Sequence, residues 1–483
     1  MPAMARPNPP ISTATLRALK NLLGPGGWLD AASERAPFET DFRGLHHGST
    51  PLVAMPDSTA GVSEFVRFCA REGLGIVPQG GNTSYCGGAT PRAGRNEIVL
   101  SFRRMRRIRA VDALNDAMTA EAGCVLADLQ SAAAAANRLL PMSLGSEGSC
   151  TLGGIISTNA GGTAVLRYGM MRALVLGLEV VLPDGRVLNQ LAALRKDNTG
   201  YDVKQLFVGA EGTLGVVTAA CLRLFPRPPA TATAMVALES PAAALALLAM
   251  LRELQGDAVT TFELIPRIGL EFVCRHIAGA RDPFERPHAW YALIETSSMQ
   301  SDADLTARFE AGLATAIERG VARDAVTATS ESQRESLWRL RETIPEAQRH
   351  EGVSLKHDIS VEPAKLPQFI DEGRALLARL APGARLVAYG HLGDGNLHFN
   401  LSAPAGNDGQ ALQSSSDTIR RAVHDLVAAH GGSFSAEHGI GQLKVGELAR
   451  YEDPAALDLM RRIKQAIDPQ GIMNPGKVLA DRE

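Results

Sequence analysis

Histidines gather near the carboxyl end of the sequence in a spacing that could form a catalytic site. Five of the eleven histidines lie between positions 391 and 438. In GHLGDGNLHFN, residues 390–400, apolar side chains alternate with His398 and Asn400, as on a strand with one apolar and one polar face. The glycine-aspartate-glycine turn at 393–395 can bring His391 back beside His398.

A carboxylate and a further imidazole follow in the segment AEHGIG, as Glu437 and His438. Two imidazoles and a carboxylate are common ligands of catalytic zinc, and the same set can hold iron(II). The pattern therefore predicts a divalent metal bound by His391, His398 and Glu437. The alternative, from the residues alone, is a group of hydrogen-bonded cleft histidines without metal.

Two glycine-rich loops could bind a phosphate group. The first is PQGGNTSYCGG, residues 78–88, and the second spans residues 145–162 with GSEGS, GG and STNAGG. Glycine lets a backbone approach a ligand closely, and successive N–H groups can hold a pyrophosphate. Neither loop matches G-x-G-x-x-G or G-x-x-x-x-G-K-[ST], which disfavours the usual nicotinamide and nucleoside-triphosphate folds. The loops could be tight turns only, but two of them so close together weaken that alternative.

Basic residues in two further segments could bind a carboxylate. Arg339 and Arg341 lie in WRLRETIPEA, which reads as a charged helix entering a turn. Lys356 lies in GVSLKHDISV, which reads as a strand. Arginine can hold a carboxylate through two parallel hydrogen bonds, and lysine acts as a point charge. Solvated surface charge is the ordinary alternative for all three side chains.

The elements that must position these residues follow from periodicity and from glycine and proline punctuation. Helices are predicted over residues 11–24, 61–72, 128–138, 242–251, 304–318 and 455–467, a hairpin over 178–189, and a strand pair over 212–226. The proline-rich segment 226–229 marks the end of a first domain. Strands and helices alternate after it, which indicates an α+β domain on an antiparallel sheet.

Composition excludes several classes of protein. Apolar residues make up 45% and charged residues 21%, as in globular proteins, and the net charge of −3 gives no basic excess for nucleic acid. The six cysteines form no C-x-x-C pair, so neither a disulfide framework nor a zinc-thiolate site is expected. No apolar run approaches the roughly 20 residues that span a bilayer, and residues 1–10 show no secretory signal. A cytoplasmic protein is therefore expected.

Three long motifs carry a resemblance to a known family. PQGGNTSYCGG, LGSEGSCTLGGIISTNAGG and KDNTGYDVKQLFVGAEGTLGVVT resemble the FAD-binding domain of the vanillyl-alcohol oxidase/p-cresol methylhydroxylase superfamily. The chain is similar to its D-2-hydroxyacid dehydrogenase branch from about residue 47 to the C-terminus, including D-2-hydroxyglutarate and D-lactate dehydrogenases. The resemblance implies an α+β fold with a two-subdomain FAD-binding domain (11–227), an α+β cap domain with the metal site on an antiparallel sheet (228–444), and a C-terminal segment (445–483) returning to the FAD domain.

The resemblance implies a set of residues that bind FAD. They are Pro78, Gly80, Gly81, Asn82, Thr83, Ser84, Gly87, Gly148, Ser149, Gly153, Gly154, Ser157, Asn159, Gly161, Val216, Val217 and Asn474. Some relatives attach FAD through a histidine of the first loop. This chain has Asn82 there and no histidine between His47 and His276, so non-covalent FAD is expected.

The resemblance also implies roles for the residues of the second half. His391, His398 and Glu437 correspond to the ligands of a divalent metal, usually zinc, and His438 to the base that accepts the hydroxyl proton. Arg341, Lys356 and Asn400 correspond to substrate-binding positions. The position four residues after Arg341 is threonine in some D-2-hydroxyglutarate enzymes and is Pro345 here, which puts the identity of the acid in doubt.

The expected function is FAD- and metal-dependent oxidation of a D-2-hydroxy acid, with D-2-hydroxyglutarate as first choice. The resemblance implies that the electrons pass to a separate acceptor, such as an electron-transferring flavoprotein or a quinone. A homodimer is a further partner prediction. D-lactate or glycolate is the alternative substrate. Two other classes are a non-catalytic flavin-binding subunit of a larger complex and a metal-dependent hydrolase without flavin.

Overall fold

The chain divides into two compact units. The structure is a computed structural model that describes residues 11–300 and 302–481. Unit 1 contains the described residues up to Gly162, together with Gly169–Pro226 and the described part from Glu437 onward, and unit 2 contains Thr163–Tyr168 and Arg227–Ala436. The first division falls beside the proline-rich boundary predicted from the sequence, and the second falls eight residues before the expected residue 445. The prediction of no signal within residues 1–10 lies outside the described residues.

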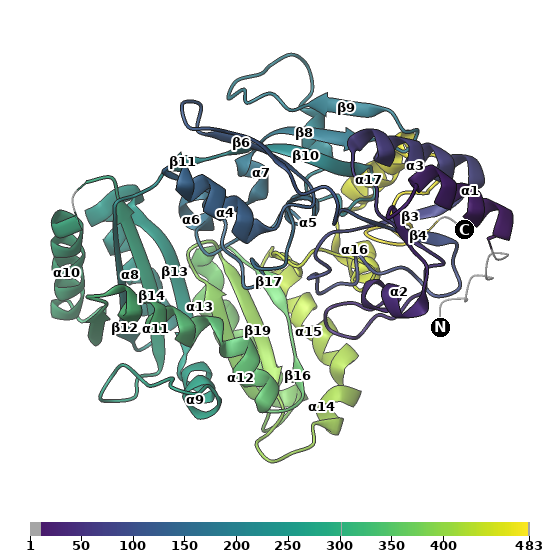
Figure 1. The fold of residues 1–483 in the computed structure, drawn as a ribbon. Coiled ribbons are helices and arrows are strands. Elements are labelled where there is room, and N and C mark those ends of the chain that lie inside the picture. The colour runs from purple at the N-terminus through teal and green to yellow at the C-terminus, as the bar shows by residue number, and fades with distance from the viewer. Residues whose placement is uncertain (1–10, 301, 482–483) are drawn as a thin grey trace. The chain divides into compact units, whose positions relative to one another are not determined.

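Unit 1 begins with a small sheet covered by helices (Figure 1). The sheet has the order β1 (Trp28–Leu29), β2 (Val53–Ala54), β4 (Glu97–Ser101) and β3 (Gly75–Gln79), and β2 and β3 run parallel to β4. Its helices are α1 (Thr13–Leu23), α2 (Ala32–Glu39) and α3 (Thr59–Glu72). Helix α3 begins because the Ser58 hydroxyl accepts the Gly61 N–H, and it ends at Gly73, whose φ of 66° is left-handed.

A second, antiparallel sheet completes the strands of unit 1. Its order is β5 (Ile108–Asp112), β6 (Ala117–Glu121), β10 (Val216–Arg223), β8 (Val175–Val181) and β9 (Val187–Gln190). Its accompanying helices are α4 (Leu126–Ala135), α5 (Leu152–Ser157) and α7 (Met171–Leu174). The predicted hairpin over 178–189 is confirmed as β8 and β9. The predicted strand pair over 212–226 is wrong: β10 is one strand, and β11 (Phe225–Pro226) pairs with β7 (Arg138–Leu139) instead.

The C-terminal segment packs within unit 1. Helix α16 (Val445–Tyr451) is followed by α17 (Pro454–Ile467), which begins where the Asp453 carboxylate accepts two N–H groups of its first turn. Met473 then forms an isolated parallel bridge with Ile76 of β3. The Lys464 ammonium donates to the carbonyls of Thr213 and Met473, so the tail is tied to the glycine-rich part of the chain.

Unit 2 is built on an eight-stranded sheet with antiparallel pairs. The order is β15 (Asp324–Thr327), β12 (Ala230–Leu238), β14 (Trp290–Ser298), β13 (Val259–Pro266), β18 (Arg385–His391), β19 (Asn396–Ser402) and β16 (Ser354–Leu355), with β17 (Asp358–Ser360) also paired to β19. This sheet confirms the α+β fold with an antiparallel sheet expected for the second half.

Helices cover both faces of that sheet (Figure 1). One face packs against α8 (Pro241–Gln255), α10 (Asp302–Glu318), α13 (Leu366–Leu380) and α15 (Ser416–Ala429). The other face packs against α9 (Arg267–His276), α11 (Glu331–Glu342) and α12 (Ile344–His350). Two shorter helices complete unit 2, α6 (Val165–Tyr168) and α14 (Gln410–Ser414). No helix among the described residues is long and apolar enough to cross a bilayer.

Strand alternation determines which side chains share a face. Leu397 and Phe399 enter the core with α8, α10 and α13, as predicted from their spacing. Val387 and Tyr389 of β18 enter the core on the α9, α11 and α12 face. Because side chains alternate along a strand, His391 and His398 belong to that second face.

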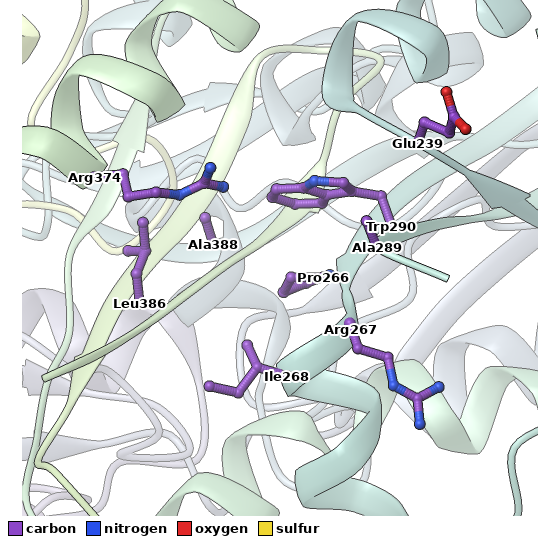
Figure 2. Close-up of a pocket in the computed structure, with 9 residues that line it drawn as sticks. All are labelled: Glu239, Pro266, Arg267, Ile268, Ala289, Trp290, Arg374, Leu386 and Ala388. Atoms are coloured by element: carbon purple, nitrogen blue, oxygen red, sulfur yellow. The ribbon is translucent and has the colours of Figure 1, made fainter. Parts of the chain in front are cut away.

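Strands β13 and β18 are in register only over two residues. Glu263 pairs with His391 and Leu264 with Gly390. Beyond these pairs lies a cavity of about 410 Å³, with Pro266, Leu386 and the ring of Trp290 among its lining residues (Figure 2). The two arginines at its edge are paired: Arg267 with Glu271 and Asp282, and Arg374 with Asp371.

Candidate active site

The two glycine-rich loops of unit 1 lie directly against each other. A Cβ atom on Gly80 would lie 2.3 Å from the Thr151 Oγ1, and one on Gly81 would lie 2.0 Å from the Ser149 carbonyl oxygen. A contact below 3.0 Å forces a neighbour to shift, and at Gly81 that neighbour is backbone, so glycine permits an approach that a side chain would prevent. The first loop follows β3, and the second leads into α5.

The surroundings of these loops suit a polar ligand. Among the described residues, the backbone N–H groups of Asn82, Thr83 and Ser84 have no protein acceptor. Gly148 has open space where a Cβ would stand. The Thr151 hydroxyl and the side-chain amide oxygen of Asn474 are buried without a hydrogen-bond partner in the described chain. Buried polar atoms are normally satisfied, so this set fits a dinucleotide with a pyrophosphate.

Three asparagines of this region adopt left-handed backbone conformations. The φ angles are 55° at Asn82, 47° at Asn159 and 39° at Asn474. The Asn82 amide donates to the Thr40 carbonyl at 2.8 Å. The side-chain amide oxygen of Asn159 accepts the backbone N–H of Arg172. The Asn474 amide donates to the carbonyls of Gly88 and Glu211, which joins the C-terminal tail to the first loop. All three side chains thus shape the loops.

Other residues predicted to bind FAD have mainly packing environments. Val216 belongs to the core beside the small sheet and Val217 to the core of the antiparallel sheet. Gly153 lies against Ala122, and Gly87 lies against the ring of His46. The predicted positions Pro78, Gly154, Ser157 and Gly161 all lie in unit 1 with the two loops.

In unit 2, an acidic residue that sequence reasoning missed accompanies His398. Asp358 of β17 lies opposite His398 of β19 in the ladder. Each offers a ligand atom within 4.8 Å of the other. His391 lies on the same hairpin, with its ring centroid 6.0 Å from that of His398, which confirms that the turn at 393–395 brings the two histidines together. Asp358 and His398 are donors that a divalent cation accepts, and both belong to a group of donor atoms close enough to hold one, whereas His391 does not belong to that group.

Glu263 connects two predicted site residues. His391 donates its Nδ1–H to one carboxylate oxygen of Glu263, and the Arg341 Nε–H donates to the other at 2.6 Å. Glu263 has no exposed surface, and Arg341 is also buried. Burial would raise the pKa of Glu263, but the charges of Arg341 and His391 outweigh it and lower the pKa to about 2. The carboxylate is therefore ionised at neutral pH.

Tyr389 links the same residues on the sheet. It lies opposite His398 in the β18–β19 ladder, with ring centroids 4.9 Å apart. The Arg341 guanidinium lies 4.8 Å from the centroid of the Tyr389 ring, a cation–π contact. Arg341 is thus not the solvated surface charge considered from its sequence context.

Asn400 holds the segment that carries Lys356. The buried Asn400 side chain accepts the backbone N–H of His357 at 3.3 Å and donates to the side-chain amide oxygen of Gln348 at 2.9 Å. The segment 352–361, predicted as one strand, is two short strands, β16 and β17, with Lys356 and His357 between them. Lys356 is exposed. Pro345 lies in the first turn of α12, where a missing N–H leaves no helical hydrogen bond unmade.

Glu437 and His438 stand at the start of the segment with which the chain re-enters unit 1. The His438 Nε2 lies 3.7 Å from a Glu437 carboxylate oxygen. The buried carboxylate of Glu211 accepts the N–H groups of Ile440 and Gly441 and so fixes the turn that follows. Burial raises the pKa of Glu211. Glu211 itself has a left-handed φ of 50°, which is uncommon for a residue other than glycine.

Comparison with known proteins decides the family. The model of the FAD linked oxidase C-terminal domain matches residues 227–478, and that of an FAD binding domain matches residues 50–190. The D-2-hydroxyglutarate dehydrogenase of Danio rerio is 38% identical over 99% of this chain and 88% of its own length. That of Arabidopsis thaliana is 36% identical over 95% and 80%, respectively. The chain belongs to the FAD-dependent D-2-hydroxyacid dehydrogenase family. It is an FAD-dependent oxidoreductase.

Further matches establish the fold and include a relative named for a different substrate. A Schizosaccharomyces pombe protein named as a D-lactate dehydrogenase is 33% identical over 97% of this chain and 90% of its own length. The structure of p-cresol methylhydroxylase matches with a TM-score of 0.77 at 16% identity, covering 98% of each chain. The predicted p-cresol methylhydroxylase type of fold is therefore confirmed.

The prediction of a cytoplasmic protein is wrong on this comparison. The names of the Danio, Arabidopsis and Schizosaccharomyces relatives place those proteins in mitochondria. The prediction relied on the absence of a signal and of a long apolar run, and these absences do not distinguish one aqueous compartment from another.

Proposed function

We propose that this oxidoreductase oxidises a D-2-hydroxy acid to the 2-oxo acid, with D-2-hydroxyglutarate as the first choice. The observation that carries the proposal is that Arg341 and His391 bond to one carboxylate, that of Glu263. A guanidinium that can bind a carboxylate is thereby held beside an imidazole that can bind a metal. An α-hydroxy acid has its carboxylate and hydroxyl on adjacent atoms, so it matches this pairing.

FAD is proposed to bind without a covalent link to the glycine-rich loops. The unpartnered N–H groups of residues 82–84 suit its pyrophosphate, and Asn82 replaces the histidine that links FAD in some relatives. The buried side-chain amide oxygen of Asn474 and the hydroxyl of Thr151 supply further polar contacts. Bound FAD supplies the two-electron acceptor for the hydride that leaves the α-carbon.

A divalent metal, with zinc as first choice, is proposed to bind through His391, His398 and Glu437. Asp358 adds a carboxylate beside His398, which the sequence did not indicate. The donor set of imidazole nitrogens and carboxylate oxygens suits zinc, manganese or iron(II). When bound, the metal polarises the substrate hydroxyl and eases its deprotonation.

The remaining groups bind the substrate and receive its proton. His438 is proposed as the base that takes the hydroxyl proton on a ring nitrogen, with Glu437 adjacent to it. Arg341 and Lys356 are proposed to bind the two carboxylates of a five-carbon diacid. Asn400 positions Lys356 by holding the N–H of His357. The electrons then leave to a separate acceptor, an electron-transferring flavoprotein or a quinone.

D-lactate is the second candidate substrate. Two observations favour it: Pro345 occupies a position at which some diacid enzymes have threonine, and one relative is named as a D-lactate dehydrogenase. Lactate lacks a distal carboxylate, so it would need only one of the two cations.

A substrate screen tests the proposal. The purified FAD-loaded protein is assayed with an artificial electron acceptor against D- and L-2-hydroxyglutarate, D-lactate and glycolate. The proposal predicts turnover of D-2-hydroxyglutarate, with higher kcat/KM than for D-lactate, and none for the L-enantiomer. Higher kcat/KM for D-lactate would transfer the assignment to the monocarboxylate. Turnover of none of these acids would refute it.

A further inference from the structure

Glu263 is the one charged residue of a buried strand. Strand β13 has the sequence VTTFELIP, and all eight of its residues are buried. Glu263 itself has no exposed surface. Removing a carboxylate from water is costly unless it is paired and hydrogen-bonded, and an apolar side chain would fill the same volume without that cost. The presence of glutamate at this position therefore calls for a role other than packing.

The two oxygens of Glu263 have different partners on different elements. One accepts the Nδ1–H of His391 on β18, and the other accepts the Nε–H of Arg341 on α11. The register of the sheet sets this arrangement, because Glu263 is directly opposite His391 in the β13–β18 ladder. The carboxylate can therefore orient the two side chains at the same time.

The contact with His391 has a chemical consequence. An ionised carboxylate only accepts hydrogen bonds, so His391 must carry its proton on Nδ1. Its Nε2 then has no proton and is the nitrogen that can bind a cation. A carboxylate behind a metal-binding histidine fixes the ring and its tautomer and increases its basicity.

The contact with Arg341 orients a side chain that is proposed to bind the substrate. The bond through Nε, together with the stacking of the guanidinium on Tyr389, fixes the plane of the guanidinium. A fixed plane matters because arginine holds a carboxylate through two parallel hydrogen bonds. The bond to Glu263 also sets the position of the Arg341 guanidinium relative to His391.

We propose that Glu263 is a positioning residue that couples metal binding to substrate binding, by holding His391 as a metal ligand and Arg341 as a carboxylate ligand. The inference rests on the proposed function, since it assigns a role in the same site. Substitution of Glu263 should therefore weaken both the bound metal and the bound acid. A residue that only stabilised the fold would change neither affinity selectively.

Glutamine distinguishes the two roles because it keeps the volume of glutamate. Its single oxygen can accept from Arg341 or from His391, but not from both. If the oxygen faces Arg341, the amide group donates to His391 Nδ1 and shifts the proton to Nε2, where it blocks a metal. In the opposite orientation, the amide N–H groups face the Arg341 donor. Glu263→Asp keeps the charge but is one methylene shorter.

Glu295 provides a matched control on the same sheet. Its carboxylate accepts from Arg334 at 2.8 Å and from the Trp338 indole N–H at 2.9 Å, both on α11. It therefore anchors the same helix as Glu263, through a different arginine and with no histidine. Glu295→Gln should perturb α11 without acting on His391.

The test measures metal affinity in protein that retains FAD. Metal-free wild type, E263Q, E263D and E295Q are titrated with Zn²⁺ against a chromophoric chelator, and FAD content and melting temperature report the fold. We expect E263Q to bind Zn²⁺ roughly 10–100-fold more weakly than wild type, E263D to fall between them, and E295Q to match wild type. The KM for the substrate should also rise in E263Q and not in E295Q.

The outcomes separate this inference from the proposed function. Zn²⁺ affinity in E263Q equal to that of wild type would overturn the coupling role. If E263Q does not fold, E263D decides, and wild-type affinity there would overturn it as well. Wild type that binds no Zn²⁺ would overturn both proposals. If E263Q binds Zn²⁺ more weakly than wild type but wild type oxidises no D-2-hydroxy acid, the proposed function is refuted. The role of Glu263 in positioning His391 would then still stand.

Discussion

The aromatic ring of Tyr85 packs against the imidazole of His438, with ring centroids 4.7 Å apart and planes inclined by 58°. Tyr85 belongs to the first glycine-rich loop, and His438 is the proposed base. The exposed ring of Phe42 contacts Tyr85 edge-on at 5.8 Å, and the Arg43 guanidinium lies 5.9 Å from the Tyr85 ring centroid. The loop that is proposed to bind FAD thus also supports the proposed base.

Removal of the Tyr85 ring should impair the base without removing it. We expect Tyr85→Ala to lower kcat by up to roughly 100-fold, because a displacement of about 1 Å can have that effect. Tyr85→Phe keeps the packing and should remain close to wild type. Steady-state kinetics with equal FAD content in both variants checks this, and equal kcat in Tyr85→Ala and wild type would show that the contact is incidental.

Loss of the His438 imidazole should act mainly on kcat. General acid–base catalysis contributes roughly 10²–10⁴-fold, so His438→Ala should lower kcat by that range. His438→Gln keeps a polar side chain but cannot accept the proton at neutral pH, so it should lower kcat by the same factor. Anaerobic stopped-flow reduction of the flavin isolates the step. A wild-type reduction rate in His438→Ala would remove this residue from the proposed mechanism.

Substitutions of Lys356 and Arg341, the two residues proposed to bind substrate carboxylates, should differ in how their effect on kcat/KM depends on substrate length. If Lys356 reads the distal carboxylate, Lys356→Ala should reduce kcat/KM for D-2-hydroxyglutarate about 10–150-fold more than for D-lactate, since a charge-assisted contact contributes roughly 1.5–3 kcal/mol. Arg341→Ala should reduce kcat/KM for both acids if it binds the carboxylate that they share. Equal losses for the two acids in both variants would favour D-lactate as substrate.

The ion-pair cluster around Glu351 should make stability depend on pH in the acid range. Burial would raise the pKa of Glu351, but hydrogen bonds from Arg385, His276 and Arg275 lower it to about 2 from an ordinary 4.5. This contribution is therefore fully present above pH 4.5 and is lost as the pH falls toward 2. Wild type should exceed Glu351→Gln in free energy of unfolding by roughly 1.5–3 kcal/mol at pH 6, and the gap should close on acidification.

Urea unfolding followed by tryptophan fluorescence measures this difference, since urea adds no salt to screen the cluster. Glu331→Gln is the control, because that carboxylate is exposed and pairs only with Arg334 among the described residues. Its effect should stay within about 1 kcal/mol at every pH. A gap between wild type and Glu351→Gln that does not change between pH 6 and pH 3 would contradict the assigned pKa.

Local sequence patterns were sufficient to predict a structural feature where the residues that interact are close in sequence. The hairpin that brings His391 beside His398 follows from a period of two and a glycine-rich turn, both visible in the sequence. The cap of α3 is local in the same way. The FAD loops could be proposed from glycine content, and the family resemblance supplied their individual residues.

Long-range pairing explains what the sequence did not reveal. Glu263 meets His391 only because β13 lies beside β18, and the order of strands in a sheet cannot be read from either segment. Its one visible signal is a lone acidic residue within VTTFELIP. Asp358 was missed for the same reason, since β17 pairs with β19 away from the main strand order. Segment 352–361 broke into two strands because the Asn400 side chain takes up the His357 N–H between them.

Anaerobic flavin reduction, before and after removal of metal, tests the central claim most directly. Metal-replete protein is mixed with excess D-2-hydroxyglutarate in the absence of oxygen and electron acceptor, and the flavin absorbance is followed. We predict complete bleaching that is abolished when a chelator has removed the metal while FAD stays bound, and restored by added Zn²⁺ or Mn²⁺. Flavin that stays oxidised with every D-2-hydroxy acid tested, or that bleaches equally well in metal-free protein, would contradict FAD- and metal-dependent oxidation of a D-2-hydroxy acid.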